Sequence, residues 1–74
     1  MVNEYKVHAF GDGEAYAWVA ESDDVPGLAT EADSIEALID KLHILIPELL
    51  KANGLSVKRI PLHLVTDWKE TITV

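Results

Sequence analysis

Acidic side chains gathered around a Pro-Gly pair are the first residues of this 74-residue sequence whose types suggest chemistry. Positions 21–33 read ESDDVPGLATEAD and place two carboxylates, Asp23 and Asp24, side by side. Paired carboxylates can perform acid–base catalysis or hold divalent metal ions. Neighbouring residues of a loop point in different directions, however, and Asp, Pro and Gly are frequent turn residues. We therefore interpret the stretch as a turn, in which one aspartate bonds the backbone ahead of Pro26-Gly27 and VPGL forms a type II turn.

Two histidines offer a second possible site. His8 and His63 fall on expected strands, each on the side opposite the apolar residues of its strand, so they approach each other if the two strands are neighbours. Asp67 would then supply an oxygen ligand for a metal ion. Histidines on strands are more often surface or interface residues, and the remaining one, His43, lies at the flank of an expected helix. We predict no metal site and no cofactor.

Sequence signatures of catalysis are absent. No serine or threonine stands in a nucleophile motif, the chain has no cysteine, and GDGEAYAW lacks the later glycine and the Lys-Ser/Thr pair of a phosphate-binding loop. We therefore expect no enzymatic activity. A metal-dependent nuclease that uses Asp24 is the third hypothesis for the function, after the two binding functions given below. The sequence has no run of ~20 apolar residues for a membrane span and no signal peptide, which predicts a cytoplasmic location without membrane contact.

The charge is unevenly distributed. Thirteen acidic residues against six basic ones give a net charge of −7, and no Lys or Arg lies between Lys6 and Lys41. Binding to a phosphate backbone requires clustered basic residues, so we expect no direct contact with nucleic acid. Two interpretations of the acidic surface stay open: a solvated surface that favours solubility, or a surface complementary to a basic protein partner.

The N-terminal part of the chain predicts three strands. Residues 4–10 alternate between polar and apolar, which is typical of a half-buried strand. A turn at 11–13 leads into a second strand at 14–22 that is apolar on both sides, and a short strand follows at 28–32. Together these patterns predict an antiparallel meander.

A long helix follows the meander. Asp33 or Ser34 begins it, and with Asp33 as the N-cap, Glu36 becomes the partner of a capping box. Apolar residues then recur every three or four positions along 35–50, and the sequence KANG ends the helix with a left-handed residue. Pro47 predicts a bend within one continuous helix.

The C-terminal tail completes the fold. The even positions 60, 62, 64, 68, 72 and 74 are all apolar, which predicts one long strand, or one interrupted by a single-residue bulge, instead of a hairpin. The sum is an α+β fold of order β-β-β-α-β in a single domain spanning 1–74: a three-stranded antiparallel meander, a fourth strand, and one long helix packed on one face of the sheet. One helix covers one face only, so we expect the other face, with Trp18 and Trp68 on it, to meet a partner. A homodimer or a higher homo-oligomer would satisfy this expectation.

A family resemblance rests on the same residues. The segment AWVAESDDVPGLATEADSIEALIDKL resembles the N-terminal domain of HicB-like antitoxins, and the similarity covers residues 15–54 well and the tail loosely. Asp24-Val25-Pro26-Gly27 matches the turn core of that family, and Ser34 with Glu36-Ala37-Leu38 matches its helix start. The sequence resembles small stand-alone HicB-like proteins of unknown function more closely still, because SDDVPGLATEAD and IPELL are characteristic of them.

The resemblance implies a partial RNase H-like fold, with the fourth strand beside the first, and usually an oligomer. It also implies binding to HicA, a small basic ribonuclease. RNase H catalysis is not implied, because the first strand offers no acidic residue on its core side. Asp23 replaces a frequent proline of the family, and no DNA-binding helical motif follows, so operator binding is not expected.

We accordingly predict an antitoxin-like, protein-binding module that neutralises a HicA-type mRNA-cleaving toxin. The residues expected to contact this partner are Tyr16, Trp18, Glu21, Asp23, Asp24 and Trp68. The residues expected to shape the turn and the helix cap are Pro26, Gly27, Asp33, Ser34 and Glu36. The alternative is a stand-alone homo-oligomeric protein that binds an unidentified ligand.

Overall fold

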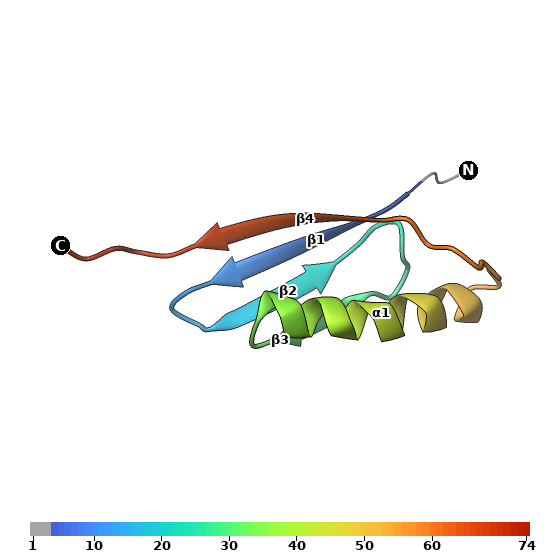
Figure 1. Cartoon of the computed structure of the whole chain (residues 1–74), viewed down its shortest axis with the longest axis horizontal. Helices are drawn as coiled ribbons and strands as arrows, with labels where there is room; N and C mark the ends of the chain where they lie inside the picture. The colour runs from blue at the N-terminus through green and yellow to red at the C-terminus, as the bar shows by residue number, and fades with distance from the viewer. Residues whose placement is uncertain (1–3) are drawn as a thin grey trace.

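The computed structural model, which describes residues 4–74, contains four strands and one helix (Figure 1). They are β1 (Tyr5–Asp12), β2 (Ala17–Glu21), β3 (Ala29–Ala32), α1 (Ile35–Ala52) and β4 (Leu62–Lys69). The strands form one sheet of order β3-β2-β1-β4, in which β1 pairs antiparallel with β2 and parallel with β4, and β2 pairs antiparallel with β3. The predicted α+β fold is confirmed, including the position of the fourth strand beside the first.

One face of the sheet carries the core. Tyr5, Val7 and Ala9 of β1 point toward α1 and are at most 8% exposed, because side chains alternate between the two faces of a strand. The helix contributes an apolar stripe at spacings of four residues, formed by Leu38, Leu42, Ile46 and Leu50. We call this the helix side of the sheet and the opposite side the open face.

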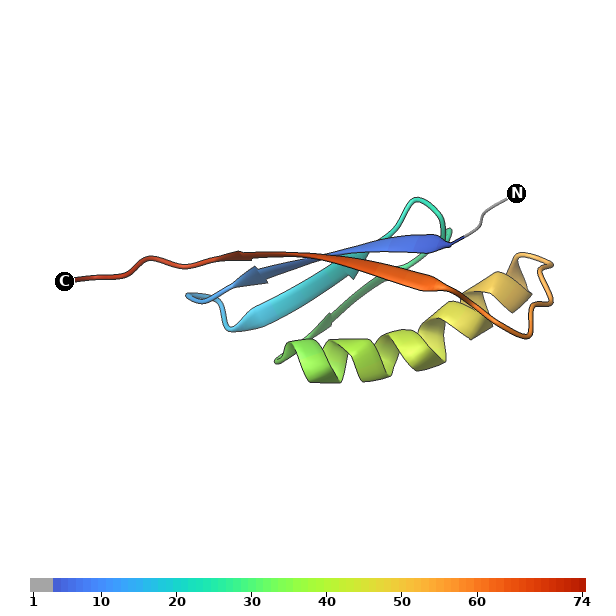
Figure 2. The same cartoon turned by 45° about the horizontal axis from the view of Figure 1, so that its top comes forward.

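The helix packs on one half of the sheet. α1 lies against β2 and β3, while β4 forms the far edge (Figures 1 and 2). No residue of β4 is buried; Leu64 and Val65 are half-buried and the others are exposed. Within residues 4–74, no helix is long and apolar enough to cross a membrane.

Ser34, one of the two predicted starts of the helix, is the N-cap of α1, so the capping box predicted for Asp33 with Glu36 is wrong. Ser34 has an extended backbone (φ −141°, ψ 162°), and its Oγ accepts a hydrogen bond from the N–H of Ala37 at 3.1 Å. Asp33 stands one residue too early to reach these N–H groups and is exposed. Glu36 still lies in the first turn, where a negative charge suits the helix dipole.

The C-terminal half of the helix follows the sequence prediction. α1 is continuous through Pro47, and its axis turns in this half (Figure 2). Gly54 takes the left-handed conformation (φ 82°), and the N–H of Leu55 donates to the carbonyl of Leu50 at 2.9 Å. This bond is a feature of a helix that ends in a Schellman motif.

The turn between β1 and β2 differs from the sequence prediction. β1 continues through Gly11 and Asp12, and the turn comprises 13–16 instead of 11–13. Asp12 organises it: its carboxylate accepts from the N–H of Glu14 and its carbonyl from the N–H of Tyr16, each at 2.9 Å. Tyr16 has a left-handed backbone (φ 52°), which is uncommon for a non-glycine residue.

Candidate protein-binding surface

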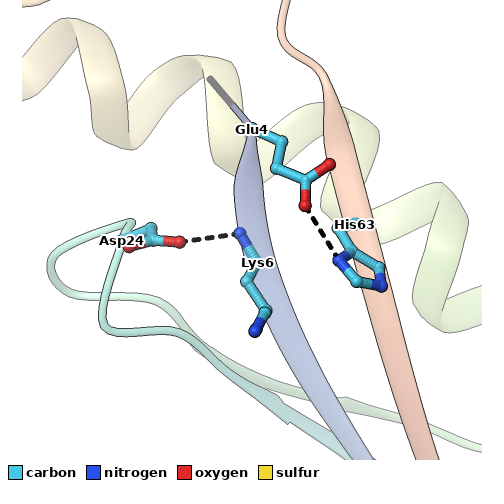
Figure 3. A network of polar contacts seen from close by, with 4 residues as sticks. All are labelled: Glu4, Lys6, Asp24 and His63. Carbon is cyan, nitrogen blue, oxygen red and sulfur yellow. Dashed lines mark hydrogen bonds and ion pairs between the residues drawn. The ribbon is translucent and has the colours of Figure 1, made fainter. Parts of the chain in front are cut away.

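The acidic stretch after β2 is anchored to the backbone of β1 (Figure 3). Asp24 accepts a hydrogen bond from the N–H of Lys6 at 2.8 Å, and the Ser22 hydroxyl donates to the carbonyl of Lys6 at 2.5 Å. The Ser22 oxygen also accepts from the N–H groups of Asp24 and Val25, at 3.1 and 3.2 Å. Because the β1–β2 register ends at Glu21, the two side chains satisfy backbone groups of Lys6 beyond the end of that ladder.

This arrangement gives Asp24 a structural role. The aspartate does bond a backbone N–H, but that of Lys6, 18 residues away, instead of a group near the turn itself. The type II turn is as predicted, because Gly27 has a positive φ of 85° and the N–H of Leu28 donates to the carbonyl of Val25 at 3.1 Å. Of the predicted partner-binding acids in this stretch, Glu21 and Asp23 are exposed and Asp24 is half-buried.

Trp18 and Trp68 lie on the helix side, so their predicted place on the open face is wrong. Both pair with Gly11, which shares its face with the buried Val7 and Ala9. The two indoles pack over Gly11 with ring centroids 5.0 Å apart and an interplanar angle of 31°. A two-residue period shows which residues share a face but cannot show which face the helix covers when both are apolar.

A side chain at Gly11 would collide with this indole pair. A Cβ there would lie 2.9 Å from Cδ2 of Trp18 and closer still to the ring of Trp68. The close approach explains why β1 passes straight through a glycine that the sequence suggests as a turn residue. Trp68 nevertheless remains 43% exposed.

The open face has an apolar centre that sequence reasoning missed. Phe10 of β1 and Val19 of β2 are paired in register and are 36% and 43% exposed. The His8 ring packs on Phe10 with centroids 4.0 Å apart. A hollow of about 360 Å³ lies here, lined by Phe10, Gly11, Asp12, Ala15, Ala17, Val19, Asp67 and Lys69. The signal for it in the sequence is Phe10 itself, an aromatic residue on the polar side of an alternating strand.

Acidic residues predominate around this centre, although Lys69 also lines the hollow and Lys6 lies beside His8. Three carboxylates face the same side because each is paired with a residue of the centre: Glu21 with His8, Glu31 with Val19, and Asp67 with Phe10. Tyr16 is 79% exposed in the turn at one end of the strands. The surface therefore combines exposed apolar groups at its centre with a polar, largely acidic border, an arrangement similar to the apolar core and polar rim of protein interfaces.

His8 and His63 lie on the open face. His63 contacts Glu4 through Nδ1 and Oε1 at 3.0 Å, and both side chains are about half exposed (Figure 3). Across residues 4–74, no group of three or more His, Asp or Glu side chains is placed to hold a metal ion. Asp67 borders the hollow instead, and His43 is exposed on α1.

Fold and surface together define a small α+β protein whose sheet is covered by a helix on one face and carries an acid-bordered apolar patch on the other. The chain belongs to the family described as Domain of unknown function (DUF1902), whose sequence profile matches residues 4–74. It is similar to hypothetical protein TTHA1013 from the extremely thermophilic bacterium Thermus thermophilus. A crystal structure of that protein superposes with a TM-score of 0.70 at 47% identity, covering 97% of this chain and 100% of the other. A comparison with curated proteins found no match.

Proposed function

We propose that this protein is an antitoxin-like module that binds a small, basic, HicA-type ribonuclease and covers its RNA-binding or catalytic surface. The observation that carries the proposal is the open face, where Phe10 and Val19 remain exposed inside a border of Glu21, Glu31 and Asp67. The position of β4 beside β1 agrees with the fold that the HicB resemblance implies.

The two parts of the surface contribute differently to binding. Desolvation of Phe10 and Val19 supplies affinity, because apolar anchors near the centre of an interface carry most of its free energy. The carboxylates steer a basic partner toward the face and raise the association rate. Asp23 extends the acidic border into the loop, whereas Asp24 is held by Lys6 and contributes less.

Charge reversal tests the proposal. The double variant Glu21→Lys/Asp23→Lys removes two acids near the open face. Asp40→Lys/Glu48→Lys makes the same change in net charge at exposed positions of α1 and serves as the matched control. We expect the first variant to slow association with a HicA-type toxin by about tenfold or more, and the control by about threefold or less.

The measurements are association kinetics and the inhibition of RNA cleavage by the toxin. An equal effect of both variants would show that only overall charge matters and would contradict binding through the open face. No complex with the wild-type protein at low ionic strength would reject the antitoxin role and favour the alternative, a stand-alone homo-oligomer that binds another ligand.

A further inference from the structure

The free edge of β4 is the largest unpaired feature of the sheet. β4 has eight residues, pairs only with β1 within residues 4–74, and lies at the edge of the sheet away from α1. Its helix-side residues include Leu62 and Trp68, which are 37% and 43% exposed. Long, exposed edge strands invite pairing with another chain.

The overall dimensions indicate that the single chain leaves more surface exposed than a compact protein of its size does. The radius of gyration is 13.6 Å, whereas a compact chain of this length has about 11 Å. The accessible surface is 5553 Å², whereas a compact monomer of 8.2 kDa exposes about 4,500 Å². The excess of about 1,000 Å², to which the exposed C-terminal tail contributes, is large enough to include the ~800 Å² that each partner buries in a standard interface.

We propose that a second copy of this chain pairs with β4. The two β4 strands run antiparallel about a two-fold axis at Val65, which joins two four-stranded sheets into one continuous sheet. The inference concerns self-association and does not rest on the proposed toxin binding.

Backbone geometry selects this register. The carbonyls of Pro61 and Lys69 accept hydrogen bonds from β1 and the turn after it, at Tyr5 and Gly13. Because backbone groups alternate in direction along a strand, the odd residues of β4 face β1 and the even residues face the free edge. Centring on Val65 pairs each even residue of β4 with another in the second copy: Leu62 with Trp68 and Leu64 with Thr66. A shift of the centre to Leu64 or Thr66 leaves even residues at one end of the strand without a partner inside β4.

Side-chain chemistry selects the same register. Leu62 meets Trp68 of the second copy on the helix side, where both are exposed in the single chain. On the open face, His63 meets Asp67 of the second copy, and Val65 meets its own equivalent. Centring on Thr66 would instead oppose His63 to Lys69 and Val65 to Asp67, which are unfavourable cross-strand pairs.

The C-terminal tail that follows β4 also favours a second copy of this chain as the partner of the β4 edge. Beyond β4 the chain projects away from the sheet (Figure 1), and Ile72 is 80% exposed. An apolar groove of about 230 Å³ lies between α1 and the start of β4, lined by Leu42, His43, Ile46, Pro47, Lys58, Ile60 and Leu62. Because the strands are antiparallel, the tail of the second copy runs past 58–60 and places Ile72 on the groove side.

The sequence, which lacks cysteine, permits a direct test by single-cysteine crosslinking. Val65 and its equivalent form a non-hydrogen-bonded antiparallel pair, whose ~4.5 Å Cα separation allows a disulfide. Thr66→Cys reports a register shifted by one residue, Val19→Cys reports packing of open faces, and Ile44→Cys reports contact through the exposed side of α1. We expect about tenfold more covalent dimer from Val65→Cys than from any other variant under mild oxidation.

Sedimentation of the wild-type chain provides the second measurement, with an expected mass of twice 8.2 kDa. Thr66→Pro should shift this dimer toward monomer, because the lost N–H faces the free edge and not β1. A monomeric wild-type chain, or a dimer that crosslinks best through Val19, Ile44 or Thr66, would overturn the proposal. Inhibition of a toxin is not part of either readout, so failure here is distinguishable from failure of the proposed function.

Discussion

At the scale of single residues, Asp24 shows what a local sequence pattern can and cannot predict. The pattern SDDVPG predicts a turn, and the type II turn at 25–28 is present. Its main tertiary contact, the bond from the Lys6 N–H to Asp24, joins residues 18 positions apart and has no local signature. The chemical identity of a carboxylate suggests a partner-binding role, and the structure shows in addition that Asp24 anchors its loop to β1.

Replacing Asp24 by alanine should destabilise the fold. Asp24→Ala removes a charge-assisted hydrogen bond and leaves the Lys6 N–H without this acceptor, which costs about 1.5–3 kcal/mol. Asp23→Ala, one residue earlier, should change the free energy of unfolding by less than about 0.5 kcal/mol. Urea denaturation of both variants measures the difference. Equal stabilities would contradict the anchoring role.

At the scale of secondary-structure elements, periodicity predicts most of the fold. The two-residue alternation in β1 and β4 and the three-to-four spacing in α1 are strong because each element has one apolar side. The errors lie where periodicity carries no information. Adjacent candidates for the N-cap, Asp33 and Ser34, have similar side chains, and the indole pair over Gly11 depends on two strands far apart in sequence.

The indole pair should fix the C-terminal half of β4 on the sheet. Gly11→Ala inserts a methyl group into the space of both rings, so we expect the rings to separate at a cost of about 1–3 kcal/mol. The aromatic circular dichroism of the protein should change with it.

Gly54→Ala is the control for this substitution. Gly54 has a positive φ of 82°, so alanine costs about 1 kcal/mol in backbone strain, but among residues 4–74 no atom beyond its two chain neighbours lies within 4 Å of the added Cβ. Both variants should lose stability, and only Gly11→Ala should alter the aromatic signal. An unchanged signal in Gly11→Ala would contradict the packing of Trp18 and Trp68 over this position.

At the scale of the whole molecule, charge affects the two proposed associations differently: self-association through β4 and binding of a basic protein by the open face. The β4 edge is suited to a copy that carries the same net charge of −7, whereas the open face is suited to a basic protein. The proposed self-association would therefore work against repulsion between two acidic chains, whereas the proposed binding of a basic toxin would be favoured by attraction. Salt screens both forces, since the Debye length falls to about 10 Å at 0.1 M ionic strength.

Ionic strength should consequently move the two equilibria in opposite directions. Raising the salt concentration should tighten the homodimer, because the apolar Leu62–Trp68 pairs and backbone hydrogen bonds remain while repulsion is screened. The same change should weaken the complex with a HicA-type toxin and slow its formation. Sedimentation of the protein alone and association kinetics with the toxin, each measured over the same salt series, test the two signs separately. A homodimer that loosens with salt would mean that the His63–Asp67 pairs, and not the apolar contacts, dominate the β4 interface.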